Sequence, residues 1–283
     1  MFFDRLPGAG YVCAHRGARA LAPENTMLAA WRCLELGADF WEMDVHKVAD
    51  GTLVVFHDDT LGRTTDVAEH TEFADRTPWA THAFSLEELR RLDAGSWFVA
   101  DDPYGTIARG MVSPDMCAQM RGQRIPTLWE ALTFTRDNDL PMNIEIKDQM
   151  QSPGDLSIVD DVLAMVRDTG TEDLILISSF NHAYLARMHQ LVPELPLAAL
   201  VEDRHPHDIV GYLRELGAMG YHPDKNMIHP NLVRTLADAG IRVTPYTVND
   251  MEQALSLIDA GCFGITTDFT HTLRQRLSGE GQE

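Results

Sequence analysis

The stretch that decides the fold lies near the N-terminus. It reads Tyr11-Val12-Cys13-Ala14-His15-Arg16-Gly17, then Pro23-Glu24-Asn25-Thr26, then Phe40-Trp41-Glu42-Met43-Asp44-Val45-His46. The first run is a short apolar strand that ends in a histidine and an arginine, and the last is a strand that carries two carboxylates two residues apart. Between them, apolar residues recur with the helical period at Met27, Leu28, Trp31 and Leu34. The pattern predicts a strand, a helix and a second strand, which is the unit of a parallel sheet.

The same alternation continues to the end of the chain. Further strands are expected at 52–56, 142–147, 174–178, 197–201, 220–221, 241–248 and 263–267. Helices are expected at 24–36, 85–90, 127–136, 155–167, 183–191, 207–216, 231–239, 251–260 and 270–277. About eight βα units without a linker predict an α/β protein with one (β/α)8 TIM-barrel domain over residues 1–283. A doubly wound open sheet is the alternative, although no G-x-G-x-x-G motif opens a helix after the first strand.

Residues 66–124 interrupt the alternation and predict a small insertion after the second βα region. Within it, Ser85-Leu86-Glu87-Glu88 has the pattern of a helix capping box. Two interpretations stay open. The insertion is either a surface excursion or a cap that shapes access for the substrate, because long loops in compact domains are often functional.

Composition restricts the partners and the location. The 283 residues include 23 basic and 43 acidic side chains, a formal net charge of −20. This charge disfavours nucleic acid and anionic membranes as partners, because basic patches supply most of the attraction to both. We see no signal peptide and no apolar run of about 18 residues, so we expect a cytoplasmic protein without stable membrane association. An anionic substrate would need a locally positive site. The oligomeric state is not readable.

Three carboxylates are expected to meet at the barrel mouth. Side chains two apart on a strand share a side, so Glu42 projects with Asp44, and Glu145 projects with Asn143 and Lys147. Catalytic side chains of such barrels lie at the C-terminal ends of the strands. Converging carboxylates repel one another unless they are protonated or bridged by a cation, and oxygen ligands suit Mg²⁺ or Ca²⁺. The plainer interpretation is that one or two of them are exposed charges at strand ends.

Two histidines stand beside these carboxylates at strand ends. His15 and His57 fit general acid and general base roles near neutral pH. Arg16 is expected to hold a phosphate through its planar guanidinium, and Lys147 to contact the same phosphate as a point charge. Arg16 in a buried ion pair is the alternative. The set fits metal-assisted attack on a phosphate ester.

The remaining polar residues of the segment carry less information. Glu24 and Asn25 follow a proline, and either begin the helix or support the site. The ten other histidines, His46 and His82 among them, are predicted to be solvated and without a role.

The motifs together resemble the glycerophosphodiester phosphodiesterase family. The matching residues are His15-Arg16-Gly17, Pro23-Glu24-Asn25-Thr26, Glu42-Met43-Asp44-Val45, Asp50-Gly51, Val54-Val55-Phe56-His57-Asp58, Thr60, Leu61, Arg63, Thr64, Thr65, Pro126-Thr127-Leu128, Glu145-Ile146-Lys147, Ser178-Ser179-Phe180, Thr247-Val248-Asn249 and Gly264-Ile265-Thr266-Thr267-Asp268. They span almost the whole chain outside residues 66–124.

The resemblance implies a TIM barrel that hydrolyses glycerophosphodiesters to glycerol 3-phosphate and an alcohol. It implies one divalent metal ion on Glu42, Asp44 and Glu145, acid–base catalysis by His15 and His57, and phosphate contacts from Arg16 and Lys147. Phe180 and Tyr246 would line the substrate pocket. The family usually has a tryptophan where this chain has Tyr246, so the aromatic wall of the pocket is expected to differ. Which histidine is the acid, and whether a cyclic phosphate forms, stay open.

The sequence leaves two alternative functions open. A lysophospholipase D or related lipid phosphodiesterase on the same scaffold should expose an apolar rim, which would be built from Trp79, Phe84, Trp97, Phe98 and Tyr104. A non-catalytic barrel that binds phosphoesters is the second alternative, and the intact set of histidines and carboxylates argues against it.

Overall fold

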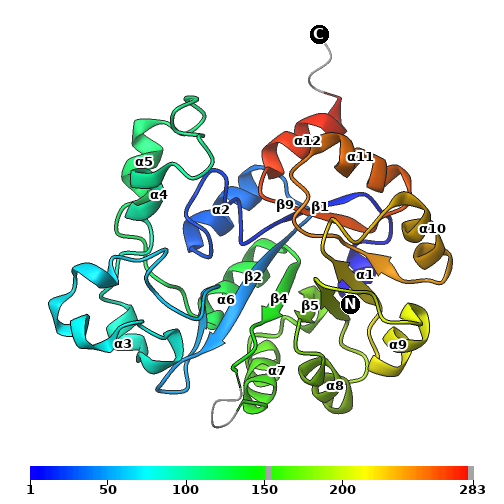
Figure 1. The fold of residues 1–283 in the computed structure, drawn as a ribbon, viewed down its shortest axis with the longest axis horizontal. Coiled ribbons are helices and arrows are strands. Elements are labelled where there is room, and N and C mark those ends of the chain that lie inside the picture. The colour runs from blue at the N-terminus through cyan, green and yellow to red at the C-terminus, as the bar shows by residue number, and fades with distance from the viewer. Residues whose placement is uncertain (151–154, 280–283) are drawn as a thin grey trace.

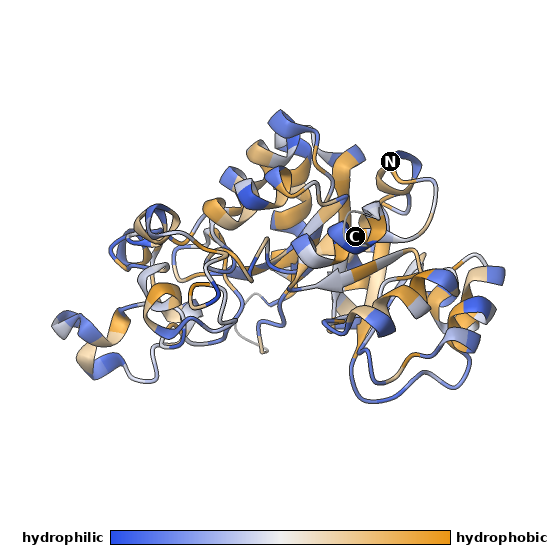
Figure 2. Cartoon of the chain, turned by 90° about the horizontal axis from the view of Figure 1, so that it is seen from above, coloured by the Kyte–Doolittle hydropathy of each residue, from blue (hydrophilic) through white to orange (hydrophobic). Residues whose placement is uncertain are grey.

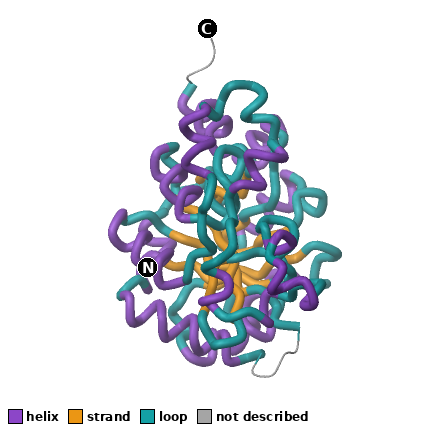
Figure 3. Tube along the Cα trace, turned by 90° about the vertical axis from the view of Figure 1, so that its left-hand side faces the viewer, coloured by secondary structure: helices purple, strands orange, loops and turns teal. Residues whose placement is uncertain are grey.

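A parallel barrel organises the protein. The computed structural model describes residues 1–150 and 155–279. Within these residues, eight parallel strands surround a common axis: β1 (Tyr11–Ala14), β2 (Phe40–Lys47), β4 (Met142–Ile146), β5 (Ile175–Ser179), β6 (Leu197–Val201), β7 (Gly220–Pro223), β8 (Arg242–Val243) and β9 (Gly264–Thr267). Figure 1 shows them inside a ring of helices, and Figure 3 shows the same strands from the side.

Hydrogen bonds nearly close the sheet on itself. The pairing order is β8-β7-β6-β5-β4-β2-β1-β9. Its two ends are joined by hydrogen bonds from the Phe263 amide to the Val243 carbonyl at 2.8 Å and from the Thr266 amide to the Pro245 carbonyl at 3.1 Å. The predicted (β/α)8 barrel is therefore confirmed, and the open doubly wound sheet is wrong.

Amphipathic helices cover the outside of the barrel. They are α2 (Met27–Glu35), α6 (Leu128–Asn138), α7 (Ser157–Thr169), α8 (His182–Leu191), α9 (Ile209–Leu216), α10 (Pro230–Asp238), α11 (Met251–Asp259) and α12 (Thr270–Ser278). Side-chain caps begin several of them, and Thr127, for example, accepts from the Glu130 amide. Hydrophobic residues concentrate on the strands and on parts of each helix, whereas hydrophilic residues occupy the rest (Figure 2).

A short N-terminal helix closes the bottom of the barrel. The helix α1 (Phe2–Arg5) was not predicted, because one apolar turn has no periodicity to detect. The Phe2 ring meets Phe40 edge-on at 5.4 Å between centroids, and the Phe3 ring meets Phe263 at 5.2 Å. This aromatic plug fills the N-terminal end of the barrel, so the chemistry is confined to the opposite mouth.

Two predicted boundaries are wrong by more than two residues. Helix α2 begins at Met27 instead of Glu24, because Thr26 caps the Ala29 amide and Asn25 has a left-handed backbone with a φ of +56°. Strand β8 ends at Val243 instead of Val248, and Pro245, which has no N–H to donate, lies in the segment that follows. The first difference matters for function, because it leaves Glu24 and Asn25 in the loop above the barrel.

The insertion forms short helices beside the first βα units. It follows β3 (Leu53–Val55), which pairs antiparallel with β2 as the expected hairpin. Its elements are η1 (Val67–Glu69), η2 (Thr71–Arg76), η3 (Thr81–Ala83), α3 (Leu86–Leu89), α4 (Ser96–Asp101) and α5 (Pro114–Met120), and Figure 1 shows α3, α4 and α5 to the left of the barrel. The capping box at Ser85 is confirmed.

Two hydrophobic clusters attach the insertion to the barrel. Phe73, Phe84 and Leu89 pack with Val48 and Val54 of the hairpin region. Leu21 and the α2 residue Leu28 pack with a second group from α4 and α5, which comprises Phe98, Met116 and Met120. None of the described helices has the length and apolar character needed to cross a bilayer.

The prediction that the other histidines are solvated is wrong for His46 and His222, which are buried, and for His182 and His205, whose ring nitrogens all bond to protein groups. His46 is 3% exposed, and its Nε2 lies 3.1 Å from the His57 carbonyl. His222 on β7 is also 3% exposed. Its neighbour Tyr221 packs in the outer core, so strand alternation turns His222 towards the barrel interior. Burial lowers the pKa of His222 to about 3. His82 is exposed, as predicted.

His222 should make the fold sensitive to mild acid. The folded protein keeps this ring neutral, whereas the unfolded chain binds a proton near pH 6.5, so stability is lost as pH falls below that value. Lowering the pH from about 7.5 to about 5 should reduce the free energy of unfolding of the wild type by about 2 kcal/mol more than that of His222→Gln. Urea titrations at both pH values measure this difference. Equal pH dependence of the two proteins would exclude a buried neutral His222.

Candidate metal and phosphate site

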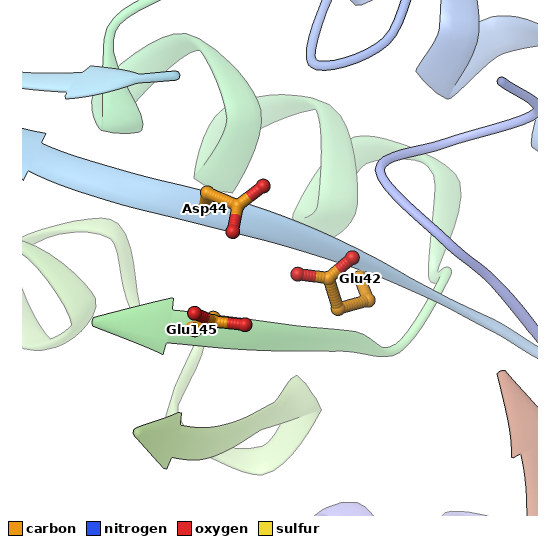
Figure 4. Close-up of side chains that lie close together, drawn as sticks. All are labelled: Glu42, Asp44 and Glu145. Atoms are coloured by element: carbon orange, nitrogen blue, oxygen red, sulfur yellow. The ribbon is translucent and has the colours of Figure 1, made fainter. Parts of the chain in front are cut away.

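Three carboxylates converge at the mouth of the barrel. Glu42 and Asp44 come from β2 and Glu145 from β4, where Asp44 and Glu145 are partners in the strand register. Each offers one oxygen, and these oxygens lie within 4.8 Å of one another. Figure 4 shows the three side chains turned towards a common space. All three residues are at least 91% buried, so the prediction that they share one site is correct and the interpretation as exposed charges is wrong.

The electrostatics of this cluster favour a cation. Burial, reinforced by the charges of Asp44 and Glu145, raises the pKa of Glu42 well above its usual value. Burial also raises the pKa of Glu145, although Lys147 opposes the shift. Within the described residues, Glu42 Oε1 and Asp44 Oδ1 are buried without a hydrogen-bond partner. Unpaired carboxylate oxygens at this spacing form a donor set that fits one hard divalent cation.

Arg16 and Lys147 lie against the same carboxylates. The Arg16 amide donates to Glu42 Oε2 at 2.8 Å, and its Nε lies 3.4 Å from Asp44 Oδ2. Lys147 Nζ donates to Glu145 Oε1 at 2.7 Å and lies 3.6 Å from Asp44 Oδ1. Burial lowers the pKa of Lys147, but Glu145 and Asp44 raise it more, so the amine stays charged. Both cations predicted from the sequence are therefore at the mouth, paired with the carboxylate cluster.

Glu24 and Asn25 support this arrangement from the loop before α2. Glu24 accepts hydrogen bonds from three arginines, namely Arg16 at 2.8 Å, Arg19 at 2.6 Å and Arg63 at 2.6 Å. Asn25 Nδ2 donates to Asp44 Oδ2 at 2.8 Å. Since a helix that began at Glu24 would place these side chains differently, the later start of α2 is what brings them to the site.

His15 forms a buried pair with an aspartate at the far end of the chain. His15 Nδ1 lies 2.7 Å from Asp268 Oδ1, and Asn249 Nδ2 donates to the other carboxylate oxygen of Asp268 at 2.8 Å. Burial and the charges of Arg16 and Arg19 lower the pKa of His15 to about 4, against the opposing effect of Asp268. The ring is therefore neutral at pH 7, and its Nε2 makes no hydrogen bond within the described residues.

His57 forms a second, similar pair next to Phe56, whose amide donates to the Asp44 carbonyl at 3.1 Å. His57 Nδ1 lies 2.5 Å from Asp58 Oδ1, and Asp58 also accepts hydrogen bonds from Arg63. Burial raises the pKa of Asp44, but the charges of His57, Arg16 and Lys147 lower it more. Each histidine thus has its Nδ1 on an aspartate, and in the described part of the chain Nε2 of His57 is also without a partner.

Phe180 and Tyr246 form an aromatic pair at the same end of the barrel. Their rings meet edge-on with 5.8 Å between centroids, and the Tyr246 hydroxyl donates to the Val201 carbonyl at 3.2 Å. Phe180 also lines a cavity of about 520 Å³ at the end of β6, together with Val201, Glu202 and Asp203. The two residues that the resemblance implied for the pocket therefore contact each other.

The residues that hold the histidines had no role predicted from the sequence. They are Asp268 and Asn249 beside His15, Asp58 beside His57, and Arg19 and Arg63, which bridge Glu24 to the two pairs. Asp58 follows His57 directly and was available as a signal. Asp268 is 253 positions from His15, and only the closure of the barrel brings the two together.

Comparison with known proteins identifies the family. A model of the glycerophosphoryl diester phosphodiesterase family matches residues 15–272. A glycerophosphodiester phosphodiesterase of Caldanaerobacter subterraneus subsp. tengcongensis is 34% identical over 93% of this chain and 95% of its own length. The chain belongs to the glycerophosphoryl diester phosphodiesterase family. The resemblance inferred from the motifs is confirmed, and membership makes the protein an enzyme of the phosphodiesterase class.

Solved structures of the family have the same fold. An Oleispira antarctica phosphodiesterase in complex with its product sn-glycerol-3-phosphate matches with a TM-score of 0.80 and 26% identity over 98% of both chains. A glycerophosphodiester phosphodiesterase from Agrobacterium tumefaciens matches with a TM-score of 0.70 and 25% identity over 94% of this chain and 99% of the other.

Neutralising one carboxylate should separate metal binding from folding. In Glu42→Gln, the amide can still accept from Arg16, and the repulsion among the buried carboxylates is reduced, so stability without added metal should be unchanged or higher. The wild type should gain about 2.7 kcal/mol at a cation concentration 100 times Kd, and the variant should lose most of this gain. Thermal unfolding with chelator, Mg²⁺ or Ca²⁺ measures both effects.

The matched control is Glu215→Gln, because Glu215 is exposed on α9. It should keep the full metal-dependent shift. An equal shift in Glu42→Gln and the wild type would show that the cluster does not bind the cation.

Proposed function

We propose that this family member is a metal-dependent phosphodiesterase that hydrolyses glycerophosphodiesters to glycerol 3-phosphate and an alcohol. The observation that carries the proposal is the pair of histidines, each on an aspartate, whose chain neighbours bond to the residues of a buried carboxylate cluster. Family membership supports the reaction class, and the product named in the Oleispira antarctica complex is the one expected here.

Glu42, Asp44 and Glu145 would hold one divalent ion, for which oxygen ligands favour Mg²⁺ or Ca²⁺. When bound, the ion supplies positive charge that polarises the phosphoryl group and stabilises charge in the transition state. The unpaired oxygens of Glu42 and Asp44 support this assignment.

Arg16 and Lys147 bind and orient the phosphate. Lys147 is paired with Glu145 and Asp44, and Arg16 with Asp44 and Glu24; a divalent ion would neutralise the charge of the two cluster carboxylates. A guanidinium suits two oxygens of a phosphate at once, while an ammonium acts as a point charge. These cations also make the site locally positive, which offsets the repulsion expected between an anionic substrate and a chain of net charge −20.

His15 and His57 move the protons. With Nδ1 held by Asp268 and Asp58, the Nε2 atom of each ring is left to work on the substrate. One ring takes the proton of the attacking hydroxyl or water, and the other donates a proton to the leaving alkoxide. Glu24 and Asn25 support the site, because they hold Arg16 and Asp44 in place.

Phe180 and Tyr246 line the pocket for the apolar surface of the substrate. Their edge-on contact at the barrel mouth supports this role. The tyrosine ring is smaller than the tryptophan usual in the family. Its hydroxyl donates to the Val201 carbonyl, which fixes the ring to the end of β6.

The alternative of a lipid phosphodiesterase loses its structural support. Its expected exposed rim is wrong, because Phe84 and Phe98 are fully buried and Trp79, Trp97 and Tyr104 are half-buried in the insertion. A non-catalytic phosphoester-binding barrel is disfavoured by the two histidine–aspartate pairs. The cytoplasmic location and the lack of nucleic-acid and membrane partners stay predictions from composition.

Removal of a catalytic histidine should abolish most turnover without unfolding the barrel. We expect His57→Ala to lower kcat for glycerophosphodiesters by about 10²- to 10⁴-fold, because general acid–base catalysis contributes on that scale. Initial rates on a panel of glycerophosphodiesters, after chelation and re-addition of Mg²⁺, Ca²⁺, Mn²⁺ or Zn²⁺, measure the effect and identify the metal.

His82→Ala, at an exposed histidine of the insertion, is the matched control and should keep full activity. Undiminished turnover by His57→Ala would refute the assignment. Tight substrate binding by the wild type without turnover in any metal would instead favour the non-catalytic alternative.

A further inference from the structure

One side chain of the insertion, Tyr104, lies at the mouth of the barrel. Tyr104 lies in the loop between α4 and α5, and this loop is anchored on the barrel. The hydroxyl of fully buried Thr106 donates to the Ala20 carbonyl at 2.8 Å. The Asp102 carboxylate accepts from the amides of Ile107 at 3.0 Å and Ala108 at 2.9 Å. The loop is therefore fixed against the β1–α2 segment, which carries Arg16 and Arg19.

The Tyr104 ring stands beside the His15–Asp268 pair. The Arg19 guanidinium carbon lies 5.7 Å from the ring centroid, and Arg19 Nη1 lies 3.2 Å from His15 Nδ1. The Phe269 ring, next in sequence to Asp268, meets Tyr104 edge-on at 5.8 Å. Two independent contacts thus place a residue of the insertion on the His15 side of the site.

The Tyr104 hydroxyl has no protein acceptor among the described residues. In residues 1–150 and 155–279 it makes no hydrogen bond, whereas the Tyr246 hydroxyl has a partner in the Val201 carbonyl. Burial raises the pKa of the phenol, and Asp268 and Glu24 raise it further against the effect of Arg19. The phenol is therefore protonated at physiological pH and keeps a proton to donate.

The groups around the Tyr104 hydroxyl also restrict which substrate group it can bind. The cationic Arg19 side chain is already next to the ring, in the range of a cation–π contact. A quaternary ammonium group would have to compete with this charge, whereas an uncharged oxygen needs only the hydroxyl. The position therefore fits an ester arm that carries hydroxyl groups, such as a glycerol or another polyol.

We infer that Tyr104 is a specificity-determining residue, whose hydroxyl donates a hydrogen bond to an uncharged, hydroxyl-bearing arm of the phosphodiester on the His15 side. The inference rests on the proposed function, since it concerns the substrate of that reaction. It assigns the insertion a part in substrate recognition and so favours the second of its two interpretations.

Tyr104→Phe removes the hydroxyl and keeps the ring with its packing on Phe269. The test compares kcat/KM for glycerophosphoglycerol, which has hydroxyls on both arms, with bis(4-nitrophenyl) phosphate, which has none. The ratio of the two values should fall about 10-fold in the variant, the loss expected for one hydrogen bond to an uncharged group. Tyr11→Phe is the matched control, because Tyr11 opens β1 at the end of the strand away from the mouth. It should leave the ratio unchanged.

Glycerophosphocholine distinguishes which arm of the substrate Tyr104 contacts. A matching loss with this substrate would mean that Tyr104 contacts the common glycerol arm, and no loss would mean that it contacts the leaving alcohol. Either result supports the inference. An unchanged ratio for glycerophosphoglycerol would overturn it, while a wild type that cleaves no diester in any metal would overturn the proposed function instead.

Discussion

The burial of three carboxylates at one barrel mouth is the constraint on which the site depends. Glu42, Asp44 and Glu145 bring like charges within 4.8 Å of one another in a place that water barely reaches. Burying unpaired charge is costly. Two cations, Arg16 and Lys147, offset part of this cost, and two oxygens that accept no hydrogen bond within the described residues, Glu42 Oε1 and Asp44 Oδ1, remain available to a further cation. Folding and the proposed metal binding would therefore be linked at this point.

The cations are themselves held by a second layer of acids. Glu24 joins Arg16, Arg19 and Arg63 through one carboxylate. Arg19 then reaches the His15–Asp268 pair, and Arg63 reaches the His57–Asp58 pair. Because one buried glutamate links both histidine pairs, a change at Glu24 would disturb the geometry of both pairs at once.

The insertion extends this arrangement beyond the common barrel. Its clusters dock on α2 and on the β2–β3 hairpin, which are the elements that carry the N-terminal half of the site. This docking brings the Tyr104 ring next to the Arg19 guanidinium. Under the two proposals, substrate preference would depend both on Phe180 and Tyr246 of the barrel and on Tyr104 of the insertion.

The sequence by itself determined the barrel and the reactive residues. The periodicity of strands and helices depends only on local backbone geometry, so it can be read from the sequence. It predicted that Glu42 and Asp44 share one face of their strand and that Glu145 and Lys147 share one face of theirs. Only the tertiary structure decided which groups hold them. Asp268 reaches His15, and Tyr104 reaches Arg19, through barrel closure and loop docking. Such contacts depend on how distant strands and loops pack together, which no local period records.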